Sequence, residues 1–183
     1  VIDCWDNFDY FKLTPKGKEA KPQIPLPVRL AGIRIDKIEA AQVLGHPSIA
    51  EKEIAALRAQ VGALPAKSVS VMESRADLAR CESDAFWQPL TADGLAFLRH
   101  AVQPLFRVVS QADFKAMRFE KDVIEASLAQ LKGEKEKYAA LTQNLTAQIG
   151  ELPLSVNVVA QEAGLIQKAQ TNHYWATMTD QAF

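Results

Sequence analysis

Residues 111–149, QADFKAMRFEKDVIEASLAQLKGEKEKYAALTQNLTAQI, are the stretch of the sequence that decides the fold. Its apolar residues recur at intervals of three, four or seven, the spacing that places side chains on one face of an α-helix. They are Ile124, Leu128, Leu131, Tyr138, Leu145 and Ile149. Lys135 and Thr142 fill the two positions that would complete a heptad seam. The period predicts one long helix, and Gly133 is the point at which it could divide into two.

The charges of this segment are balanced, with six basic and six acidic residues between positions 113 and 137. A balanced set of charges is typical of a solvated helix face and not of a polybasic groove. The apolar seam from Ile124 to Ile149 could face the rest of the chain or a second copy. Because Lys135 and Thr142 interrupt it, we favour the intramolecular contact.

The segments on either side of position 111 extend the helical pattern. We predict a short helix over 38–44 that ends at Gly45-His46-Pro47, a helix over 49–62 capped by Ser48, and a helix over about 70–83. Thr91 is expected to cap the next helix, and Pro104 to kink it. Six aromatic residues are expected in the core of the bundle: Phe86, Trp87, Phe97, Phe106, Phe114 and Phe119. The predicted fold is mainly α, a helical bundle with one long helix.

The first 35 residues differ in composition from the rest. Residues 1–27 contain four of the nine prolines, Pro15, Pro22, Pro25 and Pro27. Because proline removes a backbone donor and disfavours helix in the residue before it, we expect an extended arm, with a short strand over 28–35. The sequence therefore divides into an arm or linker, 1–35, and a helical carboxy-terminal domain, 36–183. The chain opens without Met in a strand-like run, so we expect it to be a piece of a longer polypeptide.

Length and composition narrow the classes of function. The 183 residues are 48% hydrophobic and 23% charged, which is typical of a globular domain and excludes wholesale disorder. The formal net charge of −1 does not indicate a protein built mainly to bind nucleic acid. No apolar run approaches the ~18 residues that span a membrane.

The sequence offers no catalytic or cofactor motif. Among Cys4, Cys81, His46, His100 and His173, no two lie within five positions, whereas zinc sites use paired ligands at short spacing. The eight glycines form neither a phosphate loop nor a dinucleotide fingerprint. We therefore expect no catalytic residue, no metal and no cofactor in this chain.

Two groups of residues in the arm are candidates for contacts. Four lysines could bind a partner or the phosphates of DNA: Lys12, Lys16, Lys18 and Lys21. Four aromatic residues could stack on nucleic acid bases or dock the arm on a neighbouring domain: Trp5, Phe8, Tyr10 and Phe11. We favour docking for the aromatic group.

Several motifs together resemble one known family. Residues 1–11, VIDCWDNFDYF, followed by Pro15-Lys16-Gly17, are similar to the segment after the last helicase motif in the restriction (R) subunit of type I restriction-modification enzymes. Residues 85–91, AFWQPLT, resemble the helical carboxy-terminal region of the same subunits. So do Leu95, Leu98-Arg99, Pro104-Leu105-Phe106, Phe114 and Tyr174-Trp175. These motifs occur in the expected order and cover most of the chain.

The resemblance implies a cytoplasmic type I site-specific deoxyribonuclease whose ATP-dependent motor translocates duplex DNA. In such subunits the nuclease and the ATP- and Mg²⁺-binding motor domains lie upstream, so no catalytic residue is carried over to this chain. The expected role is non-catalytic: a helical module that couples the motor domains to the modification and specificity subunits. The alternative is an accessory module that contacts duplex DNA through its basic arm.

Overall fold

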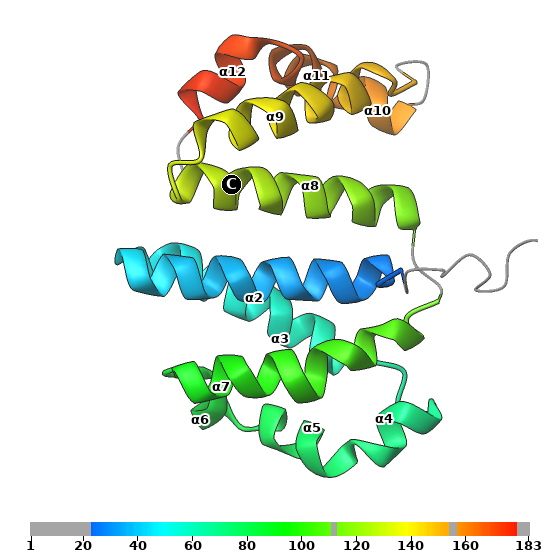
Figure 1. Cartoon of the computed structure of the whole chain (residues 1–183). Helices are drawn as coiled ribbons and strands as arrows, with labels where there is room; N and C mark the ends of the chain where they lie inside the picture. The colour runs from blue at the N-terminus through cyan, green and yellow to red at the C-terminus, as the bar shows by residue number, and fades with distance from the viewer. Residues whose placement is uncertain (1–22, 111–112, 154–156, 179–183) are drawn as a thin grey trace, which may run out of the picture.

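The computed structural model describes residues 23–110, 113–153 and 157–178 of the chain. Every regular element of these residues is helical, which confirms the mainly-α prediction. Figure 1 shows the long helix α2 in the middle of the molecule, with α8 and α9 on one side and α3 to α7 on the other. The arm lysines and aromatic residues all lie outside the described residues.

The first half of the fold is built around α2, Leu26–Leu44. It continues through α3, Pro47–Gly62; α4, Val69–Glu73; α5, Arg75–Glu82; α6, Asp84–Trp87; and α7, Ala92–Phe97. The chain then departs from α-helical geometry, with a π-turn over Leu98–Val102 and a 3₁₀ turn over Gln103–Val108. Pro104 explains this departure, because its ring removes one helical hydrogen bond. Thr91 caps α7 as predicted, accepting from the Gly94 N–H at 3.2 Å.

The predicted strand over 28–35 and the boundary of the arm at residue 35 are wrong, because the helix already begins at Leu26. Pro25 and Pro27 indicated an extended chain, yet proline is favoured in the first turn of a helix, where the N–H has no intrahelical partner. Ten residues of α2 are buried, and seven of them follow a helical period: Pro27, Leu30, Ala31, Arg34, Ile35, Ile38 and Ala41. The other three, Gly32, Lys37 and Ala40, lie outside this stripe. A charged residue within this stripe, Arg34, concealed the period in the sequence.

Of the two alternatives for residues 111–149, one long helix or two helices divided at Gly133, the structure has the second. The chain forms two helices, α8, Phe114–Leu131, and α9, Lys135–Gly150, which pack side by side (Figure 1). Gly133 lies between them at φ 72°, and the turn is closed by Gly133 N–H to Gln130 O at 2.9 Å and Glu134 N–H to Ala129 O at 2.8 Å. Three short helices follow: α10, Asn157–Gln161; α11, Ala163–Ala169; and α12, Asn172–Thr177.

The other helix boundaries agree with the predicted ones or differ from them by a few residues. Gly45, at φ 77°, ends the first helix as expected. The next helix begins at Pro47, so Ser48 is not its cap, and the helix expected over 70–83 is two helices that meet at Ser74.

The buried apolar side chains of the described residues form two main hydrophobic cores and a small third cluster, in which Ala41, Ile49 and Ala50 pack with Leu131. The larger core joins α2, α3, α5, α7 and the turns after α7 around Trp87, which is 1% exposed. The smaller core joins α8, α9, α11 and α12 around Leu145 and Trp175. Leu145 and Ile149 of the predicted seam are buried in this second core, as the intramolecular alternative requires.

Five of the six predicted core aromatics pack against one of the cores. Trp87 and Phe106 are buried, Phe86 and Phe97 are partly buried beside them, and Phe119 packs on the second core. Phe114 is the exception. It is 50% exposed, because it is the first residue of α8 and lies at the exposed end of that helix.

The turn at Gly133 gives a test of the helical hairpin. Its Cβ position is open, so the substitution Gly133→Ala adds no clash and tests only the positive φ. We expect the free energy of unfolding to fall by about 1 kcal/mol, measured by urea titration with circular dichroism. Gly62→Ala is the control, since Gly62 ends a helix in open space without a positive φ. It should leave stability unchanged or raise it; equal losses in both variants would contradict the assigned turn.

Candidate functional site

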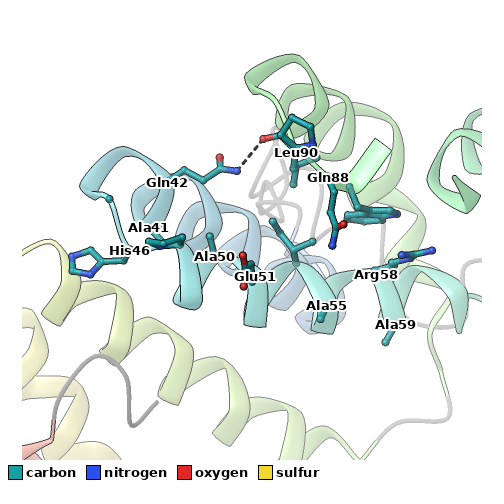
Figure 2. A pocket seen from close by; sticks show the side chains of 15 residues that line it. Ala41, Gln42, His46, Ala50, Glu51, Ala55, Arg58, Ala59, Gln88 and Leu90 are labelled. Carbon is teal, nitrogen blue, oxygen red and sulfur yellow. Dashed lines mark hydrogen bonds between the residues drawn. The ribbon is translucent and has the colours of Figure 1, made fainter. Parts of the chain in front are cut away.

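A groove of about 1000 Å³ lies at the carboxy-terminal end of α2. We call it the α2–α3 groove. Figure 2 shows that its lining comes from the end of α2, from one side of α3 and from the loop after α6. Residues 87–90 of that loop belong to the AFWQPLT motif that carries part of the family resemblance.

The bed of the groove is apolar and its walls are fixed by hydrogen bonds. Ala50, Trp87 and Leu90 are buried along it, while Ala55 and Ala59 of α3 are exposed within it. The Gln42 amide donates to Leu90 O at 2.9 Å, a bond drawn in Figure 2 that ties α2 to the loop after α6. The Trp87 indole N–H donates to Cys81 O at 2.8 Å. The groove is therefore held in shape by groups outside its apolar bed.

The rim of the groove carries charges of both signs. Glu51 and Arg58 project from α3, and His46 lies at the turn between α2 and α3 (Figure 2). Arg58 pairs with Asp84 at 2.5 Å, with both side chains exposed. An apolar bed with a polar rim is the composition of a protein-binding surface.

No group of three His, Cys, Asp or Glu side chains among the described residues is arranged to hold a metal ion. Cys81 is 6% exposed, and burial, with a smaller effect of Asp77 opposed by Arg80, raises the pKa of its thiol to about 11. A thiol of that pKa is a poor nucleophile at neutral pH.

A buried cluster of charges joins α2 to its neighbours on both sides. The Glu53 carboxylate of α3 accepts hydrogen bonds from Lys37 Nζ at 2.9 Å and from Arg34 Nη1. Arg34 Nη2 donates to Glu120 of α8. Arg34, Lys37 and Glu53 are 6%, 2% and 3% exposed, so water screens this cluster little.

A second set of charges lies on α8, where Lys121 pairs with Asp122 at 2.7 Å and with Glu125 at 2.7 Å. Burial lowers the pKa of Lys121, but its hydrogen bonds to the two carboxylates raise it by more, so the net shift is upward. Burial raises the pKa of Glu125, and its contacts with Lys121 and Lys137 lower it by more. Both groups stay charged at neutral pH.

The contact residues predicted from the sequence cannot be compared with the groove, because all of them lie outside the described residues. Lys12, Lys16, Lys18 and Lys21 lie outside the described residues, as do Trp5, Phe8, Tyr10 and Phe11. Sequence reasoning missed Gln42 and the alanines of α3 as parts of a surface. The available signal was the spacing of Ala55 and Ala59, four residues apart on one helix face next to Arg58.

The buried cluster predicts a large effect of one substitution. Glu53→Gln removes the charge that two buried cations share while keeping the size of the side chain. We expect the free energy of unfolding to fall by about 3 kcal/mol, because an unpaired buried charge is strongly destabilising. Glu51→Gln on the same helix is the matched control and should change stability by less than about 0.5 kcal/mol. Similar urea midpoints for the two variants would refute the assigned role of Glu53.

The buried thiol predicts low reactivity. In a Cys4→Ala background, Cys81 should react with an aromatic disulfide reagent at pH 8 at a rate limited by opening of the fold. Its thiolate fraction is about 100-fold lower than that of an ordinary thiol, and its sulfur is covered. The reaction should become complete in concentrated urea. Rapid reaction of the folded protein would show that Cys81 is accessible.

Two further findings bear on the class of protein. None of the described helices combines the length and apolar character needed to cross a membrane. No family model, no curated protein and no solved structure matches the chain.

Proposed function

We propose that the chain is a non-catalytic, helical protein-interaction module of a type I restriction enzyme R subunit. In this proposal it couples the ATP-dependent motor domains to the modification and specificity subunits in the cytoplasm. ATP and Mg²⁺ belong to upstream domains of the whole subunit, and duplex DNA is the track of its motor.

The observation that carries the proposal is the α2–α3 groove. Its volume of about 1000 Å³ reaches the upper end of the range for small-molecule clefts, and its apolar bed is open along the exposed alanines of α3. Such a shape suits a protein segment that inserts apolar side chains between two helices. The part of the chain that resembles the helical region of R subunits also supplies the wall of the groove, Trp87 to Leu90.

The favoured occupant is a segment of the modification or specificity subunits. The mixed charges of Glu51 and Arg58 at the rim can pair with charges of either sign on that segment. Rim charges set orientation and association rate more than affinity, so the apolar bed should supply most of the binding energy.

Co-elution with the cognate modification–specificity assembly tests the proposal. The folded chain should bind in moderate salt, and Ala55→Arg, which places a charged side chain in the apolar bed, should weaken binding by at least about 10-fold. Ala140→Arg is the matched control, because Ala140 is an exposed alanine of α9 outside the groove. Circular dichroism checks that both variants are folded.

Two results would contradict the proposal. Absence of binding by the folded wild-type chain would remove the docking function. Equal binding by Ala55→Arg and wild type would place any docking surface elsewhere than in the groove.

A further inference from the structure

A second hollow, of about 540 Å³, lies at the opposite end of α2 and has a different chemical character. It is formed where the first turn of α2 meets α8 and α9, and Figure 1 shows the starts of α2 and α8 at the same end of the molecule. Arg29, Arg118 and Lys121 contribute positive charges to its lining, and Asp122 is the one acidic residue among them. We call it the α2–α8 pocket.

The positive charge of this pocket is not neutralised within the described residues. The Asp122 carboxylate is already engaged, with Lys121 at 2.7 Å and with the Gln148 amide at 3.0 Å. Arg29 and Arg118 are exposed, and no ion pair joins either of them to another described residue. The pocket therefore holds an excess of two positive charges, both on guanidinium groups.

We propose that the α2–α8 pocket binds a phosphate group. A guanidinium presents paired N–H donors that match two oxygens of a phosphate, and two guanidiniums balance a phosphate dianion. Asn144 is also among the lining residues, and its side chain carries an amide N–H donor.

The backbone at the start of α2 also favours a bound anion. No acidic residue occupies its first turn, and Pro25 provides no side-chain cap. The first N–H groups of a helix lack intrahelical acceptors and lie at the positive end of the helix dipole. An anion bound beside Arg29 would interact favourably with both the side chain and this helix end.

The phosphate could come from a free phosphorylated compound or from the backbone of a nucleic acid. The pocket itself needs only the phosphate group. It does not depend on protein docking at the α2–α3 groove.

Titration of the 183-residue chain with inorganic phosphate at constant ionic strength tests the proposal. The readout is the NMR resonance of the arginine side-chain Nε–H groups, assigned with the variants themselves. We expect saturable shifts of Arg29 and Arg118, and a roughly 10-fold weaker affinity for Arg118→Gln, which removes one charge-assisted contact. Lys67→Gln is the matched control, because Lys67 is exposed, lies outside the pocket and carries the same charge.

A parallel titration with a short labelled DNA duplex distinguishes the two sources. If a nucleic acid supplies the phosphate, Arg118→Gln should lower the slope of log affinity against log salt by about 0.9. If phosphate binds and the duplex does not, the source is a free phosphorylated compound. Absence of saturable shifts with phosphate, or equal affinity in wild type and Arg118→Gln, would overturn the proposal.

Discussion

The carboxylate of Glu53 is the group around which the two halves of the fold are joined. It binds two cations of α2, and one of these, Arg34, also reaches Glu120 of α8. Transfer of these charges from water is costly, and the cost is offset only when every partner is in place. A rotation or shift of α2 against α3 would leave at least one charge unpaired. The cluster therefore fixes the register of three helices that apolar contacts alone would restrain less strictly.

The arrangement of the two cores explains why such a cluster is needed. The larger core includes residues of α2, whereas the second core lies among α8, α9, α11 and α12 and includes none. The contacts between α2 and α8 include the pair Arg34–Glu120 and the small apolar cluster in which Ala41 packs with Leu131. Small residues permit close approach of two helices but specify their register weakly, whereas paired charges specify it strongly. The second half of the fold is thus oriented on the first by polar and apolar contacts together.

Sequence patterns predicted those parts of the fold that depend on local chemistry. Gly45 and Gly133 end helices because they adopt positive φ, and Thr91 caps α7 with its hydroxyl, so each signal lies in one or two residues. The beginning of α2 could not be predicted in the same way. Its apolar stripe includes the buried Arg34, whose burial depends on Glu53 and Glu120, respectively 19 and 86 positions away in the sequence. No local pattern contains that information.

The candidate sites also could not be predicted from local sequence patterns. The α2–α3 groove joins Gln42 to Leu90, which are 48 positions apart, and the α2–α8 pocket joins Arg29 to Arg118. The sequence contains a weak signal for the groove, two alanines spaced four residues apart on α3. Only the packing of the helices brings the lining residues together. The arm residues selected from the sequence belong to another part of the chain.

The two proposed surfaces lie at opposite ends of α2, where the helix dipole has opposite signs. The α2–α8 pocket lies at its amino terminus and the α2–α3 groove at its carboxy terminus, separated by a helix of 19 residues, or about 28 Å. The amino-terminal end of a helix favours anions, which agrees with the excess of arginine charge there. The groove at the other end has an apolar bed and a rim of mixed charge, which suits a protein segment. Because α2 is held on both faces by packing and by the Glu53 cluster, a ligand at either end would bind to one rigid element. Ligands bound at the two proposed surfaces would therefore be held at a fixed distance from each other, set by the length of α2.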